Sequence, residues 1–122
     1  MTMKIADLKR YEKQILFQPI GDKGQQSLLN STVTIIGLGA LGSVSSNHLT
    51  RAGIGTLNLV DRDYVEKSNL QRQLLYTEKD AADRIPKAKA AADYLKKINK
   101  EIAIEAIIED VTPRNIETLI KG

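Results

Sequence analysis

Apolar and polar residues follow two different periods along this chain. Short runs at residues 33–36, 57–60 and 102–108 have the length and the aliphatic, β-branched composition of strands. The first carries no charge, which predicts a strand buried on both faces, whereas the third alternates and predicts one wet face. The buried face of the third strand is expected to carry Ile102, Ile104 and Ile108, and its wet face Glu105 and Glu109.

Helical spacing separates these runs. One helix is predicted to follow the first run and to end before Gly53, another to start at Pro86, and a last one to span residues 112–120. The apolar stripes of the first two are expected to be Leu41, Val44, His48, Leu49 and Ala52, and Ala88, Ala91, Ala92, Leu95 and Ile98. Alternating strands and helices predict an α/β, Rossmann-like parallel sheet of about three strands, with the third strand at the edge of the order 3-2-1.

Two short helices are predicted before the sheet, at about residues 7–17 and 23–29. We therefore interpret residues 1–122 as a single domain with a helical arm at 1–31, which packs against a neighbour or another subunit, and a half-sheet at 32–122. A doubly wound sheet pairs its first strand with a fourth strand, which this sequence lacks. Because an open edge is a liability, we expect a longer protein or an oligomer to cover it.

The composition limits the other possibilities. The 122 residues suffice for one core, and the absence of cysteine excludes disulfides, thiolate nucleophiles and cysteine zinc sites and fits a reducing compartment. Neither a signal peptide nor a membrane-length apolar run is present, so we expect a soluble, cytoplasmic protein without a membrane partner. The net charge is +3, but lysines alternate with acids and Trp is absent, so we expect no nucleic-acid partner.

A glycine turn follows the first strand. Gly37, Gly39 and Gly42 have the spacing G-x-G-x-x-G, in which the first permits the turn, the second lets a phosphate approach and the third lets the helix pack closely. The helix N-terminus then directs free N–H groups at an anion. Asp61 ends the second strand, where a carboxylate takes the ribose hydroxyls of a nucleotide. The complete unit predicts a nucleotide site.

A polar passage at residues 62–85 lies where ligands bind in open α/β sheets, at the carboxyl end of the second strand. Thr77 and Asp80 are expected to cap one helical turn within it. In the segment Ser68-Asn69-Leu70-Gln71-Arg72-Gln73, the arginine offers a fork for phosphate oxygens and two amides offer neutral hydrogen bonds. Lys87 sits in the first turn of the next helix, where a cation is unfavourable unless an anion lies nearby.

Five motifs, taken in order and spacing, resemble the ThiF/MoeB/HesA family, the bacterial relatives of the ubiquitin-activating enzymes. They are Arg10-Tyr11-x-x-Gln14, the GLGALG turn, Leu59-Val60-Asp61-x-Asp63, the 68–73 segment and Pro86-Lys87. The resemblance covers nearly the whole chain and the first half of the family's fold. It implies a homodimeric, ATP-dependent adenylyltransferase that activates the C-terminal Gly-Gly carboxylate of a ubiquitin-like sulfur-carrier protein, of ThiS or MoaD type, in thiamine or molybdopterin biosynthesis.

The resemblance also implies a site. Arg72 and Lys87 would be the catalytic residues, stabilising charge as a carboxylate attacks the α-phosphate. The nucleotide would be bound by Gly37, Gly39, Ala40, Gly42, Asp61, Asp63, Ser68, Asn69, Gln73 and Lys13. ATP and magnesium would be the cofactors, with no metal ligand in this chain. The magnesium acid, the zinc-binding cysteines and the carrier groove belong to the family's second half, so this polypeptide alone is expected not to complete the reaction.

Two positions depart from the family pattern. Lys13 stands where the family often has an arginine that reaches across the dimer to the triphosphate, and it keeps the charge without the bidentate fork. Ala40 stands where the family often has glycine. His48, the only histidine, is expected to be a packed core or interface residue rather than a catalyst.

Two other functions stay open from the sequence. The glycine turn with Asp61 is equally the fingerprint of an NAD-dependent oxidoreductase, although that function gives no reason for residues 69–73. The other is a non-catalytic dimerising module that keeps only the arm and the half-sheet. Preference for ATP over NAD would separate the adenylyltransferase from the oxidoreductase. Loss of nucleotide binding with a retained oligomer would indicate the non-catalytic module.

Overall fold

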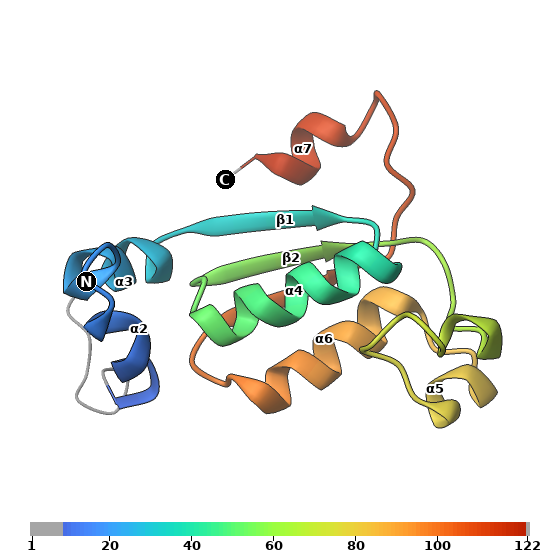
Figure 1. The fold of residues 1–122 in the computed structure, drawn as a ribbon. Helices are drawn as coiled ribbons and strands as arrows, with labels where there is room; N and C mark the ends of the chain where they lie inside the picture. The colour runs from blue at the N-terminus through green and yellow to red at the C-terminus, as the bar shows by residue number, and fades with distance from the viewer. Residues whose placement is uncertain (1–8, 122) are drawn as a thin grey trace.

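A computed structural model describes residues 9–121, and Figure 1 shows its elements. The strands are β1 (Thr32–Ile36), β2 (Thr56–Val60) and β3 (Ala103–Ile107). The helices are α2 (Glu12–Leu16), α3 (Gly21–Leu29), α4 (Ala40–Ala52), α5 (Glu78–Ala82), α6 (Lys87–Ile98) and α7 (Ile116–Ile120), with a 3-10 helix η1 (Lys67–Asn69). Of the helix predicted at residues 7–17, residues 7–8 lie outside the described residues; within them residues 9–10 are helical, Tyr11 forms a turn, and α2 follows to Leu16.

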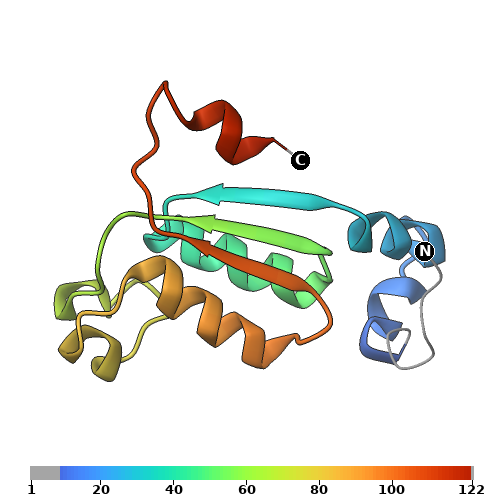
Figure 2. The same ribbon diagram turned by 180° about the vertical axis from the view of Figure 1, so that it is seen from behind.

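The three strands form one parallel sheet in the order β1-β2-β3, which confirms the predicted fold class. Figures 1 and 2 show α4 and α6 together on one face of the sheet. In both views α2 and α3 lie at the end where the strands begin, whereas η1 and α5 lie at the end to which the strands point. The polar passage after β2 is therefore at the carboxyl edge of the sheet, as predicted.

The core lies between the sheet and the two long helices. Leu57 and Leu59 of β2, Ile104 of β3 and Leu95 of α6 are all buried in it. The predicted stripe of α6 is confirmed, since Ala88, Ala91, Ala92 and Leu95 are buried and Ile98 packs against them. Small alanines let this helix lie close to the strands, which explains how a short chain forms a close-packed core.

The predicted stripe of α4 is wrong. Leu41 is 85% exposed, Val44 and His48 are also exposed, and the buried residues are Ser43, Ser46 and Thr50. Their hydroxyls let them be buried, because Ser43 and Ser46 donate to the carbonyls of Leu38 and Ser43. Leu49 and Ala52, also placed in that stripe, are partly buried. His48 is therefore not a core residue, and its proposed interface role stays a prediction.

Three smaller predictions also need correction. β1 is not buried on both faces, because α4 and α6 lie together on one face of the sheet, and Ile36 is 50% exposed. Ile108 lies beyond the end of β3 and is exposed, so only Ile102 and Ile104 form the buried face. Pro86 is the residue before α6 rather than its first residue.

The last helix begins later than predicted. The Thr112 amide donates to Asn115 Oδ1 at 2.8 Å, and Asn115 Nδ2 donates to the Asp110 carbonyl at 2.8 Å. These bonds form a turn at residues 112–115 that leads into α7, because the Ile116 N–H already donates to the Thr112 carbonyl at 3.0 Å.

The described part of the arm packs against the C-terminal ends of α4 and α6. Tyr11 is buried and its hydroxyl accepts a hydrogen bond from Asn99 Nδ2 at 2.9 Å. Gln14 and Gln25 both donate to the Ala52 carbonyl, at 3.1 and 3.0 Å, and Arg10 donates to the Ile98 carbonyl at 3.2 Å. These donors satisfy carbonyls at the C-termini of both helices, which would otherwise lack partners. The Arg10-Tyr11-x-x-Gln14 motif therefore anchors the arm to the body of the domain.

Candidate functional site

The glycine turn has the geometry that its spacing predicts. Gly37 has a φ of +92°, in the left-handed region that favours glycine. A methyl group on Gly42 would overlap the Gly37 carbonyl oxygen, so a glycine is needed for the first turn of α4 to approach the strand. Apart from its chain neighbours, the only described heavy atom within 4 Å of a methyl added at Gly39 is Gln73 Nε2, 3.9 Å away, which leaves the backbone of the turn open for a ligand.

Side chains form hydrogen bonds to both the N–H and the carbonyl of Leu38, in the middle of this turn. Its N–H donates to Asp61 Oδ2 at 2.7 Å, while its carbonyl accepts from the Tyr76 hydroxyl at 2.6 Å and from Ser43 Oγ at 3.3 Å. Tyr76 is buried, and this burial raises the pKa of its hydroxyl well above the ordinary value. Tyr76 therefore stays protonated and fixes the turn from the side of the polar passage.

A chain of hydrogen bonds joins the turn to Lys87. Asp61 Oδ1 accepts the Asp63 N–H at 2.7 Å, and the Asp63 carbonyl accepts the Lys87 N–H at 2.8 Å. The Val65 N–H donates to the Ile85 carbonyl at 2.8 Å, so the two ends of the passage pair with each other. Residues far apart in sequence thus meet at the carboxyl edge of the sheet. Each carboxylate oxygen of Asp61 accepts one of these hydrogen bonds and keeps a lone pair for a further donor.

A polar pocket of about 360 Å³ opens at this point. The residues that line it are Asp63, Tyr64, Glu66, Asn69, Arg84 and Lys87. Lys87 is only 7% exposed, and among residues 9–121 it has no carboxylate within ion-pair distance. A buried ammonium without a counter-charge is costly, so the pocket is suited to an anion.

The structure brings some of the other predicted residues to this edge. Asn69 lines the pocket, and its Oδ1 accepts the Glu66 N–H at 2.8 Å. Gln73 is buried beside Gly39, and its Oε1 has no hydrogen-bond partner in the described part of the chain, which leaves an acceptor for a ligand or water. Ala40 is the first residue of α4 and is half-buried.

Arg72 and Lys13 do not line the pocket. Arg72 is exposed, and its guanidinium donates to the Ser68 carbonyl at 3.0 Å, so it faces back onto η1; Ser68 is exposed as well. Lys13 is exposed on α2, at the opposite end of the sheet from the polar passage (Figures 1 and 2). Lys13 therefore lies far from the pocket of its own chain.

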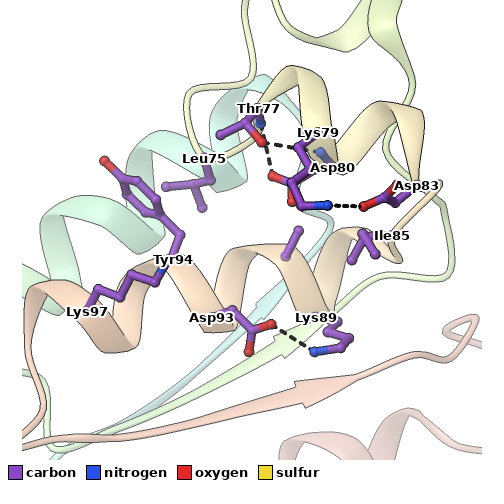
Figure 3. A pocket seen from close by; sticks show the side chains of 11 residues that line it. Leu75, Thr77, Lys79, Asp80, Asp83, Ile85, Lys89, Asp93, Tyr94 and Lys97 are labelled. Carbon is purple, nitrogen blue, oxygen red and sulfur yellow. Dashed lines mark hydrogen bonds and ion pairs between the residues drawn. The ribbon is translucent and has the colours of Figure 1, made fainter.

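A second pocket, of about 320 Å³, lies between α5 and α6 (Figure 3). Its charges are largely paired: Lys79 with Asp83 and Lys89 with Asp93, each at 2.8 Å. Asp80 accepts the Thr77 N–H at 2.9 Å, which confirms the predicted cap of α5. The pairing of these charges contrasts with Lys87 and makes this pocket the weaker candidate.

Within the described part of the chain, no group of three or more His, Cys, Asp or Glu side chains is arranged to hold a metal ion. None of its helices is long and apolar enough to cross a bilayer.

Comparison with known proteins identifies the relatives of this arrangement. The ThiF family matches residues 11–122, which is nearly all of the chain. This chain belongs to the ThiF family. The resemblance seen in the sequence is thereby confirmed, and the turn, the passage and Lys87 are parts of a ThiF-family domain.

Individual relatives agree with the family match. The sulfur carrier protein ThiS adenylyltransferase of Bacillus subtilis is 50% identical over 112 residues, which are 92% of this chain and 33% of the relative. The molybdopterin-synthase adenylyltransferase of Escherichia coli is 43% identical over 107 residues, 85% of this chain and 42% of the relative. The ThiF-family chain thus spans less than half the length of these curated relatives.

A solved structure shows the same fold with a nucleotide. The E. coli tRNA N6-threonylcarbamoyladenosine dehydratase in complex with ATP superposes with a TM-score of 0.88 at 26% identity, covering 97% of this chain and 47% of that one.

Sequence reasoning about this ThiF-family site missed two residues. Tyr76 reads in the sequence as one more aromatic residue, because nothing local signals that its hydroxyl reaches Leu38. Left-handed backbone is usually predicted where the sequence has glycine or asparagine, so nothing in the sequence indicates that Arg84 adopts it, at a φ of +50°.

Proposed function

We propose that this chain forms the ATP-binding part of an adenylyltransferase that activates the C-terminal Gly-Gly carboxylate of a ubiquitin-like sulfur-carrier protein. The observation that carries the proposal is Lys87, a buried cation that lines a polar pocket and has no acidic partner among residues 9–121. In this proposal residues 32–122 form the nucleotide-binding half-sheet and residues 1–31 the arm. The adenylyltransferase names of the B. subtilis and E. coli relatives support it.

ATP fits the arrangement of the carboxyl edge. The α-phosphate would approach the open backbone at Gly39, where the N-terminus of the 13-residue α4 offers free N–H groups. Asp61 would accept the ribose hydroxyls with its remaining lone pairs. The β- and γ-phosphates would then extend toward the pocket at Lys87. The ATP complex of the structurally similar dehydratase supports this assignment.

The chemistry requires fixed cations more than a base. The carrier carboxylate is already ionised at neutral pH, so no proton has to be removed before its oxygen attacks the α-phosphorus. A bond between that oxygen and phosphorus forms as the bond to the β-phosphate oxygen breaks, and pyrophosphate leaves. Lys87 would neutralise the charge on the leaving group, and Arg72 would turn from the Ser68 carbonyl to the phosphates.

Magnesium would enter with the ATP phosphates rather than on a preformed site. Asp63 and Glu66 line the pocket, and magnesium is commonly held by one or two carboxylates together with substrate phosphates. The predicted zinc site concerns residues outside this chain, which has no cysteine to supply.

The position of Lys13 supports a homodimer. Because α2 lies at the opposite end of the sheet from the passage, Lys13 would serve the pocket of a second copy rather than its own. We propose a cytoplasmic location, in keeping with relatives that are named as adenylyltransferases of a sulfur carrier protein and of molybdopterin synthase. The greater identity to the ThiS enzyme favours a ThiS-type carrier over a MoaD-type carrier.

Two experiments test the proposal. In calorimetric titration of the purified chain, ATP with magnesium should bind and NAD should not; preference for NAD would favour the oxidoreductase, and no binding with a defined oligomer would favour the non-catalytic module. In the full-length polypeptide, ATP–pyrophosphate exchange should depend on a carrier that ends in Gly-Gly, tested with ThiS-type and MoaD-type proteins. Exchange that neither carrier stimulates would contradict the proposed substrate.

A further inference from the structure

Helix α5 ends in a turn that glycine usually occupies. The Arg84 N–H donates to the Ala81 carbonyl at 3.2 Å, and the Ile85 N–H donates to the Asp80 carbonyl at 3.0 Å. This pair of bonds is the Schellman motif, whose left-handed residue is most often glycine because a side chain there is strained. Here that residue is Arg84, with a φ of +50°, the only non-glycine residue with positive φ among residues 9–121.

The Arg84 side chain lies in the pocket of Lys87. It lines the same 360 Å³ space, and its guanidinium carbon is 6.0 Å from the centroid of the Tyr64 ring, which also lines that pocket. An aromatic face at this distance attracts the guanidinium and orients it. The strained backbone thus places a planar, permanently charged group in the pocket that Lys87 also lines.

The acids near Arg84 do not neutralise it by direct contact. Asp83 pairs with Lys79 at 2.8 Å, and the cation nearest to Asp63 is Arg62, at 3.8 Å. No carboxylate of the described chain lies within 4.0 Å of the Arg84 guanidinium. By contrast, Lys79 and Lys89 of the pocket in Figure 3 each have an aspartate partner. Within the described chain, the pocket thus holds two cations, Arg84 and Lys87, that make no direct ion pair with the carboxylates of Asp63 and Glu66 that also line it.

We propose that Arg84 is a further phosphate-binding residue, which holds the β- and γ-phosphates of ATP and the pyrophosphate product. The proposal rests on the proposed function, since it assigns the pocket to the triphosphate. None of the glycine-turn residues lines this pocket, which instead begins where the hydrogen bonds from Leu38 through Asp61 and Asp63 reach Lys87. A nucleotide whose α-phosphate lies at the turn therefore presents its outer phosphates to Arg84.

The test compares the full chain with its Arg84→Gly variant, by binding of ATP, AMP and inorganic pyrophosphate and by thermal melting. Glycine suits the left-handed position, so the variant should melt at a higher temperature. Loss of a charge-assisted contact to phosphate should nevertheless weaken ATP and pyrophosphate about 10-fold and leave AMP unchanged. Arg84→Lys should recover part of the affinity, and Lys79→Ala, which removes a charge from α5 outside this pocket, should bind as the wild type does.

Each outcome of these measurements either supports the assignment of Arg84 or overturns it. Higher melting temperature with weaker ATP and pyrophosphate binding supports the assignment. Unchanged ATP binding in Arg84→Gly overturns it, and so does an equal loss for AMP, because that result would mean a general disturbance of the site. A Lys87→Met variant measured beside it separates the two proposals: if Lys87→Met loses ATP while Arg84→Gly does not, the role of Arg84 is wrong and the proposed function stands. If the wild type binds neither ATP nor pyrophosphate, both are wrong.

Discussion

The Tyr76 hydroxyl donates a 2.6 Å hydrogen bond to the Leu38 carbonyl, across 38 residues of sequence. It joins the polar passage to the centre of the glycine turn, opposite the 2.7 Å hydrogen bond that the Leu38 N–H donates to Asp61. Both contacts hold a loop whose glycines would otherwise leave it free to change shape. The turn is therefore preorganised by side chains that the glycine motif does not contain, and preorganisation lowers the cost of binding a ligand.

Tyr76→Phe should weaken both stability and nucleotide binding. The ring still fills the core, but the Leu38 carbonyl keeps only the longer bond from Ser43. The expected loss is about 1 kcal/mol, which lowers the melting temperature by about 4 °C. Melting curves and ATP titrations of the two proteins measure these effects, with Tyr94→Phe, an exposed tyrosine, as the control. An unchanged melting temperature would show that the hydrogen bond does not hold the turn.

The same tyrosine should make stability depend on alkaline pH. Burial raises the pKa of Tyr76 in the folded protein, whereas in the unfolded chain it ionises near pH 10. Its contribution is thus complete below about pH 10 and is lost as the pH rises further, because only the unfolded chain gains from ionisation. The melting temperature of the wild type should fall toward that of Tyr76→Phe above this pH. Parallel curves from pH 7 to about pH 11 would contradict the assignment.

Two glycine substitutions should separate folding from binding. In Gly42→Ala the new methyl overlaps the Gly37 carbonyl oxygen, so we expect a destabilisation of about 1–3 kcal/mol. In Gly39→Ala the methyl meets only Gln73 Nε2 at 3.9 Å, so the fold should be retained. The methyl of Gly39→Ala would, however, stand where the phosphate approaches, and ATP should bind about 10-fold more weakly. If Gly39→Ala binds ATP normally, the phosphate does not lie against that part of the turn.

The sequence predicts the elements whose signals are local. The strand order, the position of Gly37 and Gly42, the cap at Thr77 and the alanine stripe of α6 all follow from spacing and residue type. The face of α4 does not, because its buried residues are serines and a threonine, whose hydroxyls find carbonyl partners only in the folded protein. Polar residues that are buried with partners thus reverse a pattern based on hydrophobicity alone.

The residues of the candidate site likewise divide into those that the sequence predicts and those that only the fold reveals. Lys87 is visible in the sequence as a cation in the first turn of a helix. Its burial, and its lack of an acidic partner within the described chain, depend on the pairing of residues 63–65 with 85–87. Tyr76 and Arg84 depend on contacts between distant segments, and no local rule identifies them.

Lys87→Met provides the most direct test of an anion site at the carboxyl edge of this sheet. Methionine fills similar space without charge, so the melting temperature should stay the same or rise, because a buried unpaired cation is costly. ATP affinity should fall about 10- to 100-fold, the value of one or two charge-assisted contacts. Lys89→Met, which removes an exposed lysine paired with Asp93, should change ATP binding little. Calorimetric titration of ATP into the three proteins gives the answer: selective loss in Lys87→Met supports the account, and equal affinity in all three would contradict it.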